Sequence, residues 1–159
     1  IVKTKYENQM VVSPDVGGVV RARALAKFLD DADLAIIDKR REKENQSQVM
    51  NVIGDVKDKT CILVDDIIDT AGTICNAAEA WKESGAKKVV SYATHAVLSG
   101  DALKNISSSR LDELIVTDTI PLSEMALSTK KIKSISMDKT IAEAINRVNK
   151  EESISQMFL

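Results

Sequence analysis

Short apolar runs alternate along the chain with segments of helical periodicity, and this alternation constrains the fold more than any other feature. In the clearest helical segment, Val20, Ala24 and Phe28 recur at every fourth position and Leu25 and Leu29 extend the same face, which predicts an amphipathic helix. Strands separated by helices form βαβ units, whose strands run parallel. The sequence therefore predicts an α/β fold with a mostly parallel, twisted sheet flanked by helices. The predicted strands are residues 10–13, 34–38, 49–56, 61–64, 88–97, 113–118 and 132–136, and the predicted helices are residues 19–29, 74–84, 101–106 and 140–149.

Length, charge and cysteine usage exclude several classes of protein. At 159 residues the chain is expected to form a single domain. A net charge of −2 excludes nucleic-acid binding through bulk positive charge. No apolar stretch approaches the ~20 residues that a membrane-spanning helix needs. Cys61 and Cys75 lack metal-ligand spacing and no secretory signal is present, so we expect reduced thiols in a cytoplasmic protein.

Three polar loops follow predicted strands, at residues 13–18, 38–44 and 65–73. In parallel sheets, ligands bind in the crevice outside the carboxyl ends of the strands. We therefore expect these three loops to build one site. The chain contains neither of the glycine-rich nucleotide-binding motifs, G-x-x-x-x-G-K-[ST] and G-x-G-x-x-G, so any phosphate site must be of another kind.

The loop DDIIDTAGT, residues 65–73, combines carboxylates with a turn of small residues before a helix. A helix N-terminus offers unpaired N–H groups and partial positive charge, which favour a phosphate, and Ala71 and Gly72 let that phosphate approach the backbone. Asp65 and Asp66 would repel a bare phosphate, but they suit sugar hydroxyls or a Mg²⁺ ion. The loop therefore predicts a site for a phosphorylated sugar. The alternative is a helix capped by Asp and Thr that binds no ligand.

The other two loops carry a glycine pair and a run of cations. In SPDVGG, Gly17 and Gly18 allow an anion to approach the backbone, and Asp15 is a candidate Mg²⁺ ligand; the alternative is a simple turn. In DKRREKE, the cations at residues 39–41 can close on the negative charge of a phosphoryl group in transfer. The alternative for this second loop is a solvated, charged face.

The three loops together carry a resemblance to a known family. ILVDDIIDTAGT resembles the phosphoribosyl-diphosphate (PRPP) binding motif of the type I phosphoribosyltransferase fold. SPDVGG and DKRR resemble the pyrophosphate loop and the catalytic flexible loop of ribose-phosphate diphosphokinases, or PRPP synthetases. The resemblance covers essentially the whole chain and matches the C-terminal half of these enzymes. It implies an enzyme of nucleotide biosynthesis that transfers the diphosphoryl group of Mg-ATP to the anomeric hydroxyl of ribose 5-phosphate, giving PRPP and AMP.

The resemblance also implies a role for each matched residue. The residues implied to hold the 5-phosphate of the sugar are Asp69, Thr70, Ala71, Gly72 and Thr73. Asp65 and Asp66 are implied to face the ribose hydroxyls. Lys39 and Arg41 are implied to be the catalytic pair, with Arg41 also contacting the sugar phosphate or the transferring group. The residues implied for the pyrophosphate side are Asp15, Gly17 and Gly18, with Asp15 the ligand of Mg²⁺.

Two departures from the family pattern affect these expectations. Glu-Lys-Glu follows the cations at residues 42–44, where many family members continue with Pro or further basic residues, so later contacts of this loop are in doubt. An N-terminal α/β domain, which supplies most of the ATP site and a histidine ligand for Mg²⁺ in the family, is absent from this chain. His95 is the only histidine, and we expect it to be a structural histidine or one that is hydrogen-bonded near a subunit interface.

The resemblance also implies binding partners, and two alternative functions remain open. The family implies a homo-oligomer, a hexamer built from dimers, with no nucleic acid or membrane partner. One alternative function is a non-catalytic regulatory subunit similar to PRPP synthetases, but such a subunit would be expected to lose parts of these loops. The other is a phosphoribosyltransferase that consumes PRPP, which would need a group that recognises a base.

Overall fold

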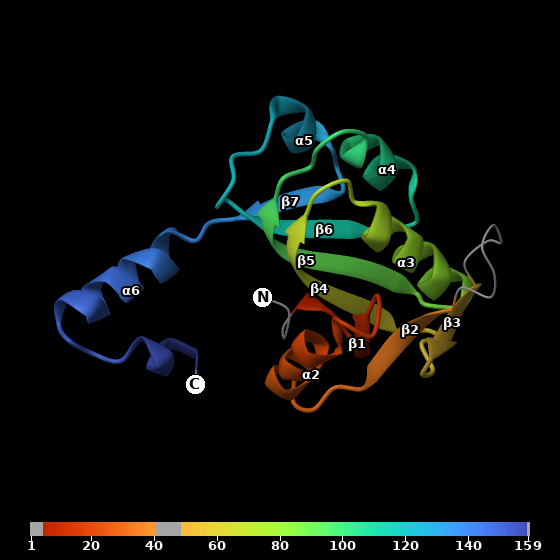
Figure 1. Ribbon diagram of the computed structural model, residues 1–159, viewed down its shortest axis with the longest axis horizontal. Coiled ribbons are helices and arrows are strands. Elements are labelled where there is room, and N and C mark those ends of the chain that lie inside the picture. Colours follow the sequence, from red (N-terminus) through yellow and green to blue (C-terminus); the bar gives the residue numbers. More distant parts are fainter. Residues whose placement is uncertain (1–4, 41–48, 159) are drawn as a thin grey trace.

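A seven-stranded sheet forms the centre of the computed structural model, which describes residues 5–40 and 49–158 (Figure 1). The strands are β1 (Gln9–Ser13), β2 (Leu34–Arg40), β3 (Val49–Ile53), β4 (Thr60–Ile68), β5 (Lys88–Ala96), β6 (Glu113–Thr117) and β7 (Ile132–Ile135). Their order across the sheet is β3-β2-β1-β4-β5-β6-β7. Within the described residues, β2 and β3 pair antiparallel and every other neighbouring pair is parallel. The predicted α/β fold with a mostly parallel sheet is therefore confirmed.

Helices pack on both faces of this sheet. The described helices are α2 (Val19–Phe28), α3 (Gly72–Glu83), α4 (Ala102–Ser108), α5 (Glu124–Ser128), α6 (Asp138–Asn149) and the 3-10 helix η1 (Ile154–Phe158), of which α6 and η1 lie away from the sheet. Residues of α2 join one apolar cluster with Val11 of β1, whereas residues of α3 and α4 join a larger cluster with Val12. Because successive residues of a strand point to opposite faces, α2 covers one face while α3 and α4 cover the other.

The buried face of α2 differs from the predicted one. The predicted stripe contains Val20 and Phe28, but their side chains are 80% and 67% exposed. The helix buries Ala22 and Ala26 against the sheet, and of the predicted face only Leu29 and, in part, Leu25 join them. Small alanine side chains let a helix approach a sheet closely, and Val20 and Phe28 lie on the outer side of α2. Alanines contribute little to a periodic pattern of hydrophobicity, which explains why the sequence did not predict the face of α2 that contains Ala22 and Ala26.

Two strands extend further than predicted. Strand β2 continues through Lys39 and Arg40, at positions where the sequence predicts a loop, because their backbones pair with β3. Strand β4 continues to Ile68 because its last residues pair with β5. The acidic pair Asp65 and Asp66 therefore belongs to β4 itself and has the fixed orientation of strand residues. Polar side chains do not end a strand when its backbone hydrogen bonds continue to be satisfied.

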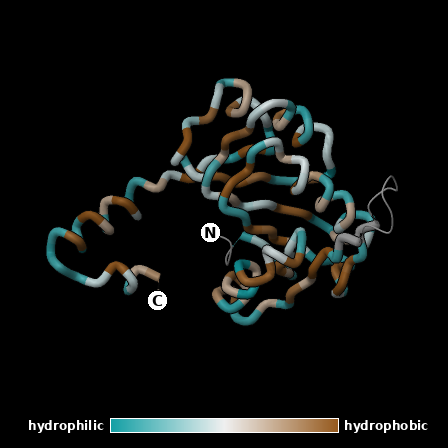
Figure 2. The backbone as a smooth tube through the Cα atoms, in the orientation of Figure 1, coloured by the Kyte–Doolittle hydropathy of each residue, from teal (hydrophilic) through white to brown (hydrophobic). Residues whose placement is uncertain are grey.

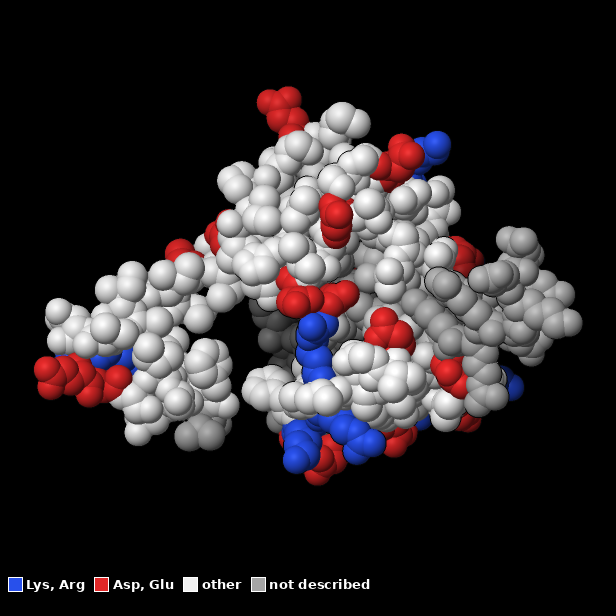
Figure 3. Space-filling view, in the orientation of Figure 1, with Lys and Arg blue, Asp and Glu red and all other residues white. Residues whose placement is uncertain are grey.

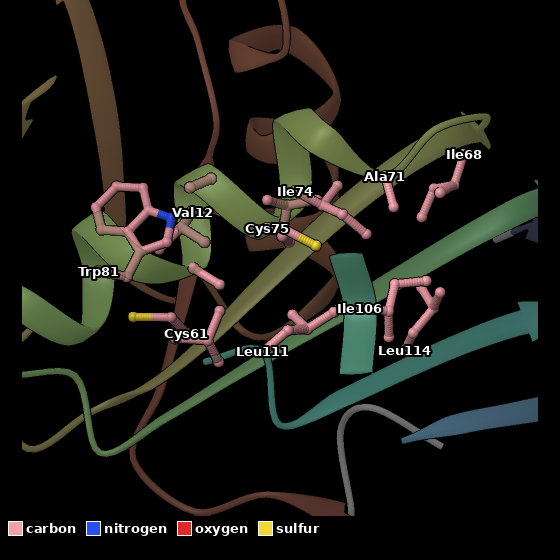
Figure 4. Close-up of a cluster of buried hydrophobic side chains, with 14 of the residues drawn as sticks. Val12, Cys61, Ile68, Ala71, Ile74, Cys75, Trp81, Ile106, Leu111 and Leu114 are labelled. Carbon is pink, nitrogen blue, oxygen red and sulfur yellow. The ribbon is translucent and has the colours of Figure 1, made fainter. Parts of the chain in front are cut away.

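The larger apolar cluster lies between the sheet and the α3–α4 layer (Figure 4). Trp81 of α3 is the largest fully buried side chain, with 0% of its surface exposed, and Ile106 of α4 and Leu114 of β6 are buried with it. Burial raises the pKa of the Cys61 thiol to about 12, and burial also raises the pKa of Cys75. Both cysteines are free thiols, as predicted, and their raised pKa values keep them protonated and unreactive near neutral pH.

A buried carboxylate is surrounded by lysines at the amino ends of the sheet strands. The side chain of Glu113 is 12% exposed and forms ion pairs with Lys5 at 2.6 Å, with Lys133 at 3.0 Å, and with Lys88. Lys5 and Lys88 also lie over the ring of Tyr6, at 4.9 and 5.1 Å from its centroid. Burial alone would raise the pKa of Glu113, but the hydrogen bonds from the three lysines lower it to about 2.

This cluster predicts a loss of stability in acid. Because the pKa of Glu113 is lowered in the folded protein, its ionised form stabilises the fold at pH values above about 4.5. That stabilisation, about 2–3 kcal/mol, is lost as the pH falls from about 4.5 toward 2. Urea unfolding measured between pH 7 and pH 2 should therefore show a smaller loss of stability for Glu113→Gln than for the natural chain. Equal losses in the two proteins would contradict this assignment.

The C-terminal part of the chain leaves the sheet. After β7, helix α6 and η1 form an arm that stands apart from the rest of the molecule (Figure 1). None of the residues of α6 is buried. No helix in the described part of the chain is both long enough and apolar enough to cross a membrane.

Candidate functional site

Strands β1 and β4 are neighbours at the point where the chain reverses its direction of travel across the sheet. From β1 the chain proceeds outward to β2 and β3, and from β4 it proceeds the other way to β5, β6 and β7. The loop after β1 leads into α2 on one face, and the loop after β4 leads into α3 on the other. The two loops therefore separate and open a crevice at the carboxyl ends of the strands, which is where open α/β sheets bind ligands.

The loop after β1 is held by its own polar groups. The Ser13 hydroxyl donates to the carbonyl oxygen of Asp15 at 2.6 Å, and the Gly18 amide donates to the Asp15 carboxylate at 2.9 Å. A Cβ atom added at Gly18 would lie 2.7 Å from the Ser13 hydroxyl oxygen, so a larger residue would displace the hydroxyl that holds the loop. This close approach explains why the second glycine of SPDVGG is needed.

The loop after β4 is fixed by residues that follow β5. The Ser99 amide donates to the carbonyl oxygen of Asp69 at 3.1 Å, and the Ser99 hydroxyl donates to the Asp69 carboxylate. The side-chain amide of Asn105, on α4, donates to the carbonyl oxygen of Thr70 at 3.0 Å. Ala71 adopts the left-handed conformation, with φ of 61°, which a residue with a Cβ atom visits at a cost. The surrounding contacts therefore hold this turn in a shape that it would not adopt alone.

The turn presents the N-terminus of helix α3 to the crevice. The first intrahelical hydrogen bond runs from the Cys75 amide to the carbonyl oxygen of Ala71 at 3.1 Å, so the amides of Gly72, Thr73 and Ile74 precede it. No side chain caps these amides at Ala71. Unpaired amides at the positive end of the helix dipole bind anions, and a Cβ atom at Gly72 would have its nearest neighbour 3.9 Å away.

Two adjoining cavities line this edge of the sheet. The first has a volume of about 290 Å³ and is lined by Asp15, Asp65, Ile67, Ile68, Asp69, Thr70, Ala71, Gly72, Thr73 and Ile74. The second has a volume of about 190 Å³ and is lined by Pro14, Asp15, Gly17, Gly18, Arg21, Val64, Asp65 and Thr73. Asp15, Asp65 and Thr73 line both cavities, so the two form one continuous cleft. The structure thus brings together the loops at residues 13–18 and 65–73, as the sequence predicts.

Arg21 joins the two sides of the cleft and was not predicted as a site residue. Its guanidinium pairs with the Asp65 carboxylate and lies 3.3 Å from the Asp66 carboxylate. Figure 3 shows acidic and basic side chains meeting near the middle of the visible face. Arg21 lies in the first turn of α2, where the helix dipole disfavours a cation, so an anionic partner was to be expected there. A cation in the first turn of a predicted helix is therefore the sequence signal that could have identified Arg21 as a site residue.

The two carboxylates that contact Arg21 have different environments. Burial and the adjacent Asp66 side chain raise the pKa of Asp65, while Arg21 acts in the opposite direction. The hydrogen bond with Asp65 and the charge of Arg21 lower the pKa of Asp66, whose side chain is 66% exposed. Asp65 lines both cavities of the cleft, whereas Asp66, which the sequence also predicts as a site residue, lines neither and is the better solvated anion.

This geometry predicts the effect of removing the cation. Arg21→Gln should raise the pKa of Asp65, because the guanidinium in contact with this carboxyl favours its ionised form. The measurement is the pH titration of the Asp65 side-chain carbonyl carbon by NMR. Arg23→Gln, at an exposed position of the same helix, is the matched control and should leave the titration unchanged. A titration in Arg21→Gln that matches the natural chain would contradict the ion pair.

The remaining predicted residues lie elsewhere or outside the described chain. The backbone of Lys39 lies in β2, three residues beyond Ile36, which pairs with Ser13. At ~3.3 Å per residue, this position is about 10 Å past the end of β1, on the same edge of the sheet as the cleft. Arg41 lies outside the described residues. His95 has its Nδ1 atom 3.0 Å from the Thr119 hydroxyl oxygen.

Magnesium was predicted at Asp15, and the described residues provide a partial site. They contain no cluster of three or more His, Cys, Asp or Glu side chains that could hold a metal ion by themselves. Asp15 and Asp65 nevertheless line the same cleft. Mg²⁺ usually binds to one or two carboxylates together with water and the phosphates of a substrate. The residues therefore fit an ion that arrives with a phosphorylated ligand.

Comparison with known sequences identifies the family. The family described as phosphoribosyl synthetase-associated domain matches residues 30–159. The chain belongs to this family. Among curated proteins, the chain is similar to relatives named ribose-phosphate pyrophosphokinase. The relative from Coxiella burnetii is 64% identical over 155 residues, which are 98% of this chain and 49% of the relative. The relative from Haemophilus influenzae is 60% identical over 156 residues, which are 98% of this chain and 50% of the relative.

Solved structures agree with this family assignment. The phosphoribosylpyrophosphate synthetase from Mycobacterium smegmatis matches with a TM-score of 0.81 and 40% identity, over 91% of this chain and 46% of that one. The orotate phosphoribosyltransferase from Aeropyrum pernix matches with a TM-score of 0.53 and 19% identity, over 91% of this chain and 68% of that one. The second likeness shows the shared phosphoribosyltransferase fold. The chain spans about half the length of the curated relatives it matches.

Proposed function

We propose that this chain is the ribose 5-phosphate-binding and catalytic-loop half of a ribose-phosphate pyrophosphokinase. In the proposed reaction, the diphosphoryl group of Mg-ATP is transferred to the anomeric hydroxyl of ribose 5-phosphate, giving PRPP and AMP. The observation that carries the proposal is the cleft between β1 and β4, which is lined by Asp15, by Asp65 and by an uncapped helix N-terminus. The identity of 64% to a ribose-phosphate pyrophosphokinase supports this choice among phosphoribosyl chemistries.

The turn before α3 is proposed to hold the 5-phosphate. The amides of Gly72 and Thr73 point from the positive end of the helix, and the Thr70 and Thr73 side chains line the cavity. Asp69 does not favour a phosphate by charge. Its role is to keep the turn in shape through the two hydrogen bonds from Ser99, while Ala71 brings the backbone close to the bound anion.

The acidic pair is proposed to hold the sugar. The oxygen atoms of Asp65 and Asp66 are hydrogen-bond acceptors, and the ribose hydroxyls are donors. Arg21 fixes the orientation of Asp65 before the sugar binds, so less conformational freedom is lost on binding. It also offsets the repulsion between the carboxylates and the sugar phosphate.

The loop after β1 is proposed to bind the pyrophosphate side of the reaction. The backbone at Gly17 and Gly18 lines the second cavity, and Asp15 lines both. Asp15 and Asp65 would bind a Mg²⁺ ion that enters the site with the nucleotide phosphates. This ion would neutralise part of the phosphate charge. The rest of the ATP site is proposed to come from the half of the enzyme that this chain does not span.

Charge stabilisation is proposed to come from the cations after Asp38. The anomeric oxygen forms a bond to the β-phosphorus of ATP, the bond from that phosphorus to the oxygen of the α-phosphate breaks, and AMP leaves. Negative charge spreads over the phosphate oxygens in the transition state. Lys39 and Arg41 are proposed to close on this charge, with Arg41 also contacting the sugar phosphate or the transferring group. We further propose a cytoplasmic homo-oligomer, as in the family that the sequence resembles.

The test is a comparison of two substrate pairs in a full-length enzyme. The chain replaces the matched half of the Coxiella burnetii relative, and phosphorus NMR follows the products. Conversion of ATP and ribose 5-phosphate to AMP and PRPP is the expected result. Consumption of PRPP with a purine or pyrimidine base would instead identify a phosphoribosyltransferase. Failure to convert either pair, in a chimera that is folded, would favour the regulatory subunit.

A further inference from the structure

Helix α4 supports the turn that is proposed to hold the 5-phosphate. Its residue Asn105 donates a side-chain N–H to the carbonyl oxygen of Thr70 at 3.0 Å. Thr70 and Ala71 line the first cavity of the cleft, whereas Asn105 lines neither cavity. Asn105 therefore contacts the turn from the side that faces away from the cleft, and it lies outside the sequence motif of residues 65–73.

Helix α4 has a fixed position relative to the sheet. Figure 1 shows it beside α3, and Figure 2 shows the hydrophobic strands on which both helices pack. Ala102 and Ile106 of α4 are fully buried. The Lys131 ammonium donates to the carbonyl oxygens of Ile106 at 3.1 Å and of Ser109 at 2.6 Å, which satisfies carbonyls at the end of the helix and suits its dipole. Asn105 is thus carried by a rigid element.

The segment between β5 and α4 holds the base of the same turn. The Val97 and Leu98 amides both donate to the carbonyl oxygen of Ile68, at 2.9 and 3.1 Å. Leu98 adopts the left-handed conformation, with φ of 51°, as Ala71 does in the turn. A residue with a Cβ atom keeps this conformation only where the surrounding contacts determine it. The turn and the segment after β5 therefore fix each other's shape.

The hydrogen bond from Asn105 sets the direction of the amide at Ala71. The peptide between Thr70 and Ala71 is planar and trans, so its carbonyl oxygen and its N–H point in opposite directions. Because the oxygen points to Asn105, the Ala71 N–H points away from α4, toward the cavity that Ala71 lines. With a left-handed residue at this position, the successive amides of residues 71–73 form a concavity that suits an anion.

We propose that Asn105 is a positioning residue for the sugar phosphate and acts through the Thr70–Ala71 peptide. By holding the carbonyl oxygen, it keeps the Ala71 N–H directed at the phosphate, beside the amides of Gly72 and Thr73. Without the Asn105 side chain, this peptide is free to rotate and to present its oxygen, which repels a phosphate. Orientation before binding reduces the conformational freedom that is lost on binding. The inference rests on the proposed function, which assigns the 5-phosphate to this turn.

Steady-state kinetics on the chimera with the Coxiella burnetii relative tests this role. Asn105→Ala removes the donor, and Asn105→Asp replaces it with a group of the same shape that only accepts. Both variants should raise the KM for ribose 5-phosphate by about tenfold, as expected for one lost charge-assisted hydrogen bond, and leave kcat within about twofold. Ser107→Ala, at an exposed position of α4, is the matched control and should change neither value. An unchanged KM in Asn105→Ala would overturn the proposal, as would a fall in kcat without a change in KM.

Amide NMR separates the orientation of this peptide from a general loss of structure. In the natural chain, the amide signals of Ala71, Gly72 and Thr73 should all shift on titration with ribose 5-phosphate. In Asn105→Ala, we expect the signals of Gly72 and Thr73 to shift at higher sugar phosphate and the signal of Ala71 not to follow them. An Ala71 signal that moves equally in the two proteins would overturn the proposal. If none of the three signals responds in the natural chain, the proposed function fails at this turn and the role of Asn105 falls with it.

Discussion

Lys39→Ala is expected to lower the turnover number of the full-length enzyme by at least about 100-fold. The β2 backbone carries Lys39 about 10 Å beyond the end of β1, on the edge of the sheet where the cleft opens. The proposed transition state spreads negative charge over phosphate oxygens, and loss of one preorganised cation or donor in such a site has an effect of this order. The change acts on the transition state, so the affinity for ribose 5-phosphate should change little.

The measurement is steady-state kinetics on the chimera with ATP and ribose 5-phosphate. Lys27→Ala removes an exposed lysine in the last turn of α2 and is the matched control, with turnover expected to equal that of the unmodified chimera. Thermal unfolding of both variants shows whether they are folded. A turnover number for Lys39→Ala within about threefold of the control would contradict a catalytic role for this lysine.

Trp81→Ala is expected to lower the free energy of unfolding by about 3–5 kcal/mol. The indole is fully buried between α3 and the sheet, beside Cys61 (Figure 4). Removal of this side chain leaves a cavity that the small neighbours Ala77 and Ala78 cannot fill by moving their side chains. Because α3 starts at the proposed phosphate-binding turn, this packing also holds the helix N-terminus in place.

Urea unfolding measures this effect, and Trp81→Phe is the informative comparison. The indole Nε1 atom has no hydrogen-bond partner within the described residues, so phenylalanine loses volume but no hydrogen bond. We expect Trp81→Phe to retain most of the stability that Trp81→Ala loses. Equal losses in the two variants would mean that the volume of the side chain is not what stabilises this part of the core.

The site residues in the loops after β1 and β4 could be predicted from the sequence because each belongs to a short, contiguous motif. Asp15, Gly18, Asp65 and Gly72 each belong to a short sequence motif, and the order of strands and helices alone predicts that such motifs meet at one edge of a sheet. The structure brings all four to the same cleft.

Contacts between distant segments could not be predicted in this way. Ser99 and Asn105 lie 30 and 35 residues from the turn that they hold, and no local pattern marks them. Arg21 lies 44 residues from Asp65, and only its position in the first turn of a helix hints at an anionic partner. The buried face of α2 was mispredicted because alanines fill it, and periodicity detects large apolar residues better than small ones.

Phosphorus NMR of the isolated chain titrated with ribose 5-phosphate tests the central claim most directly, because it asks whether the turn at residues 69–73 holds a sugar phosphate. We predict that the phosphorus resonance shifts and broadens at millimolar sugar phosphate. Asp69→Ala, which removes the carboxylate that accepts from the Ser99 hydroxyl, should weaken this binding by about tenfold, as expected for one lost charge-assisted hydrogen bond. A resonance that does not change with the natural chain, or that changes equally with Asp69→Ala, would contradict the assignment of this turn.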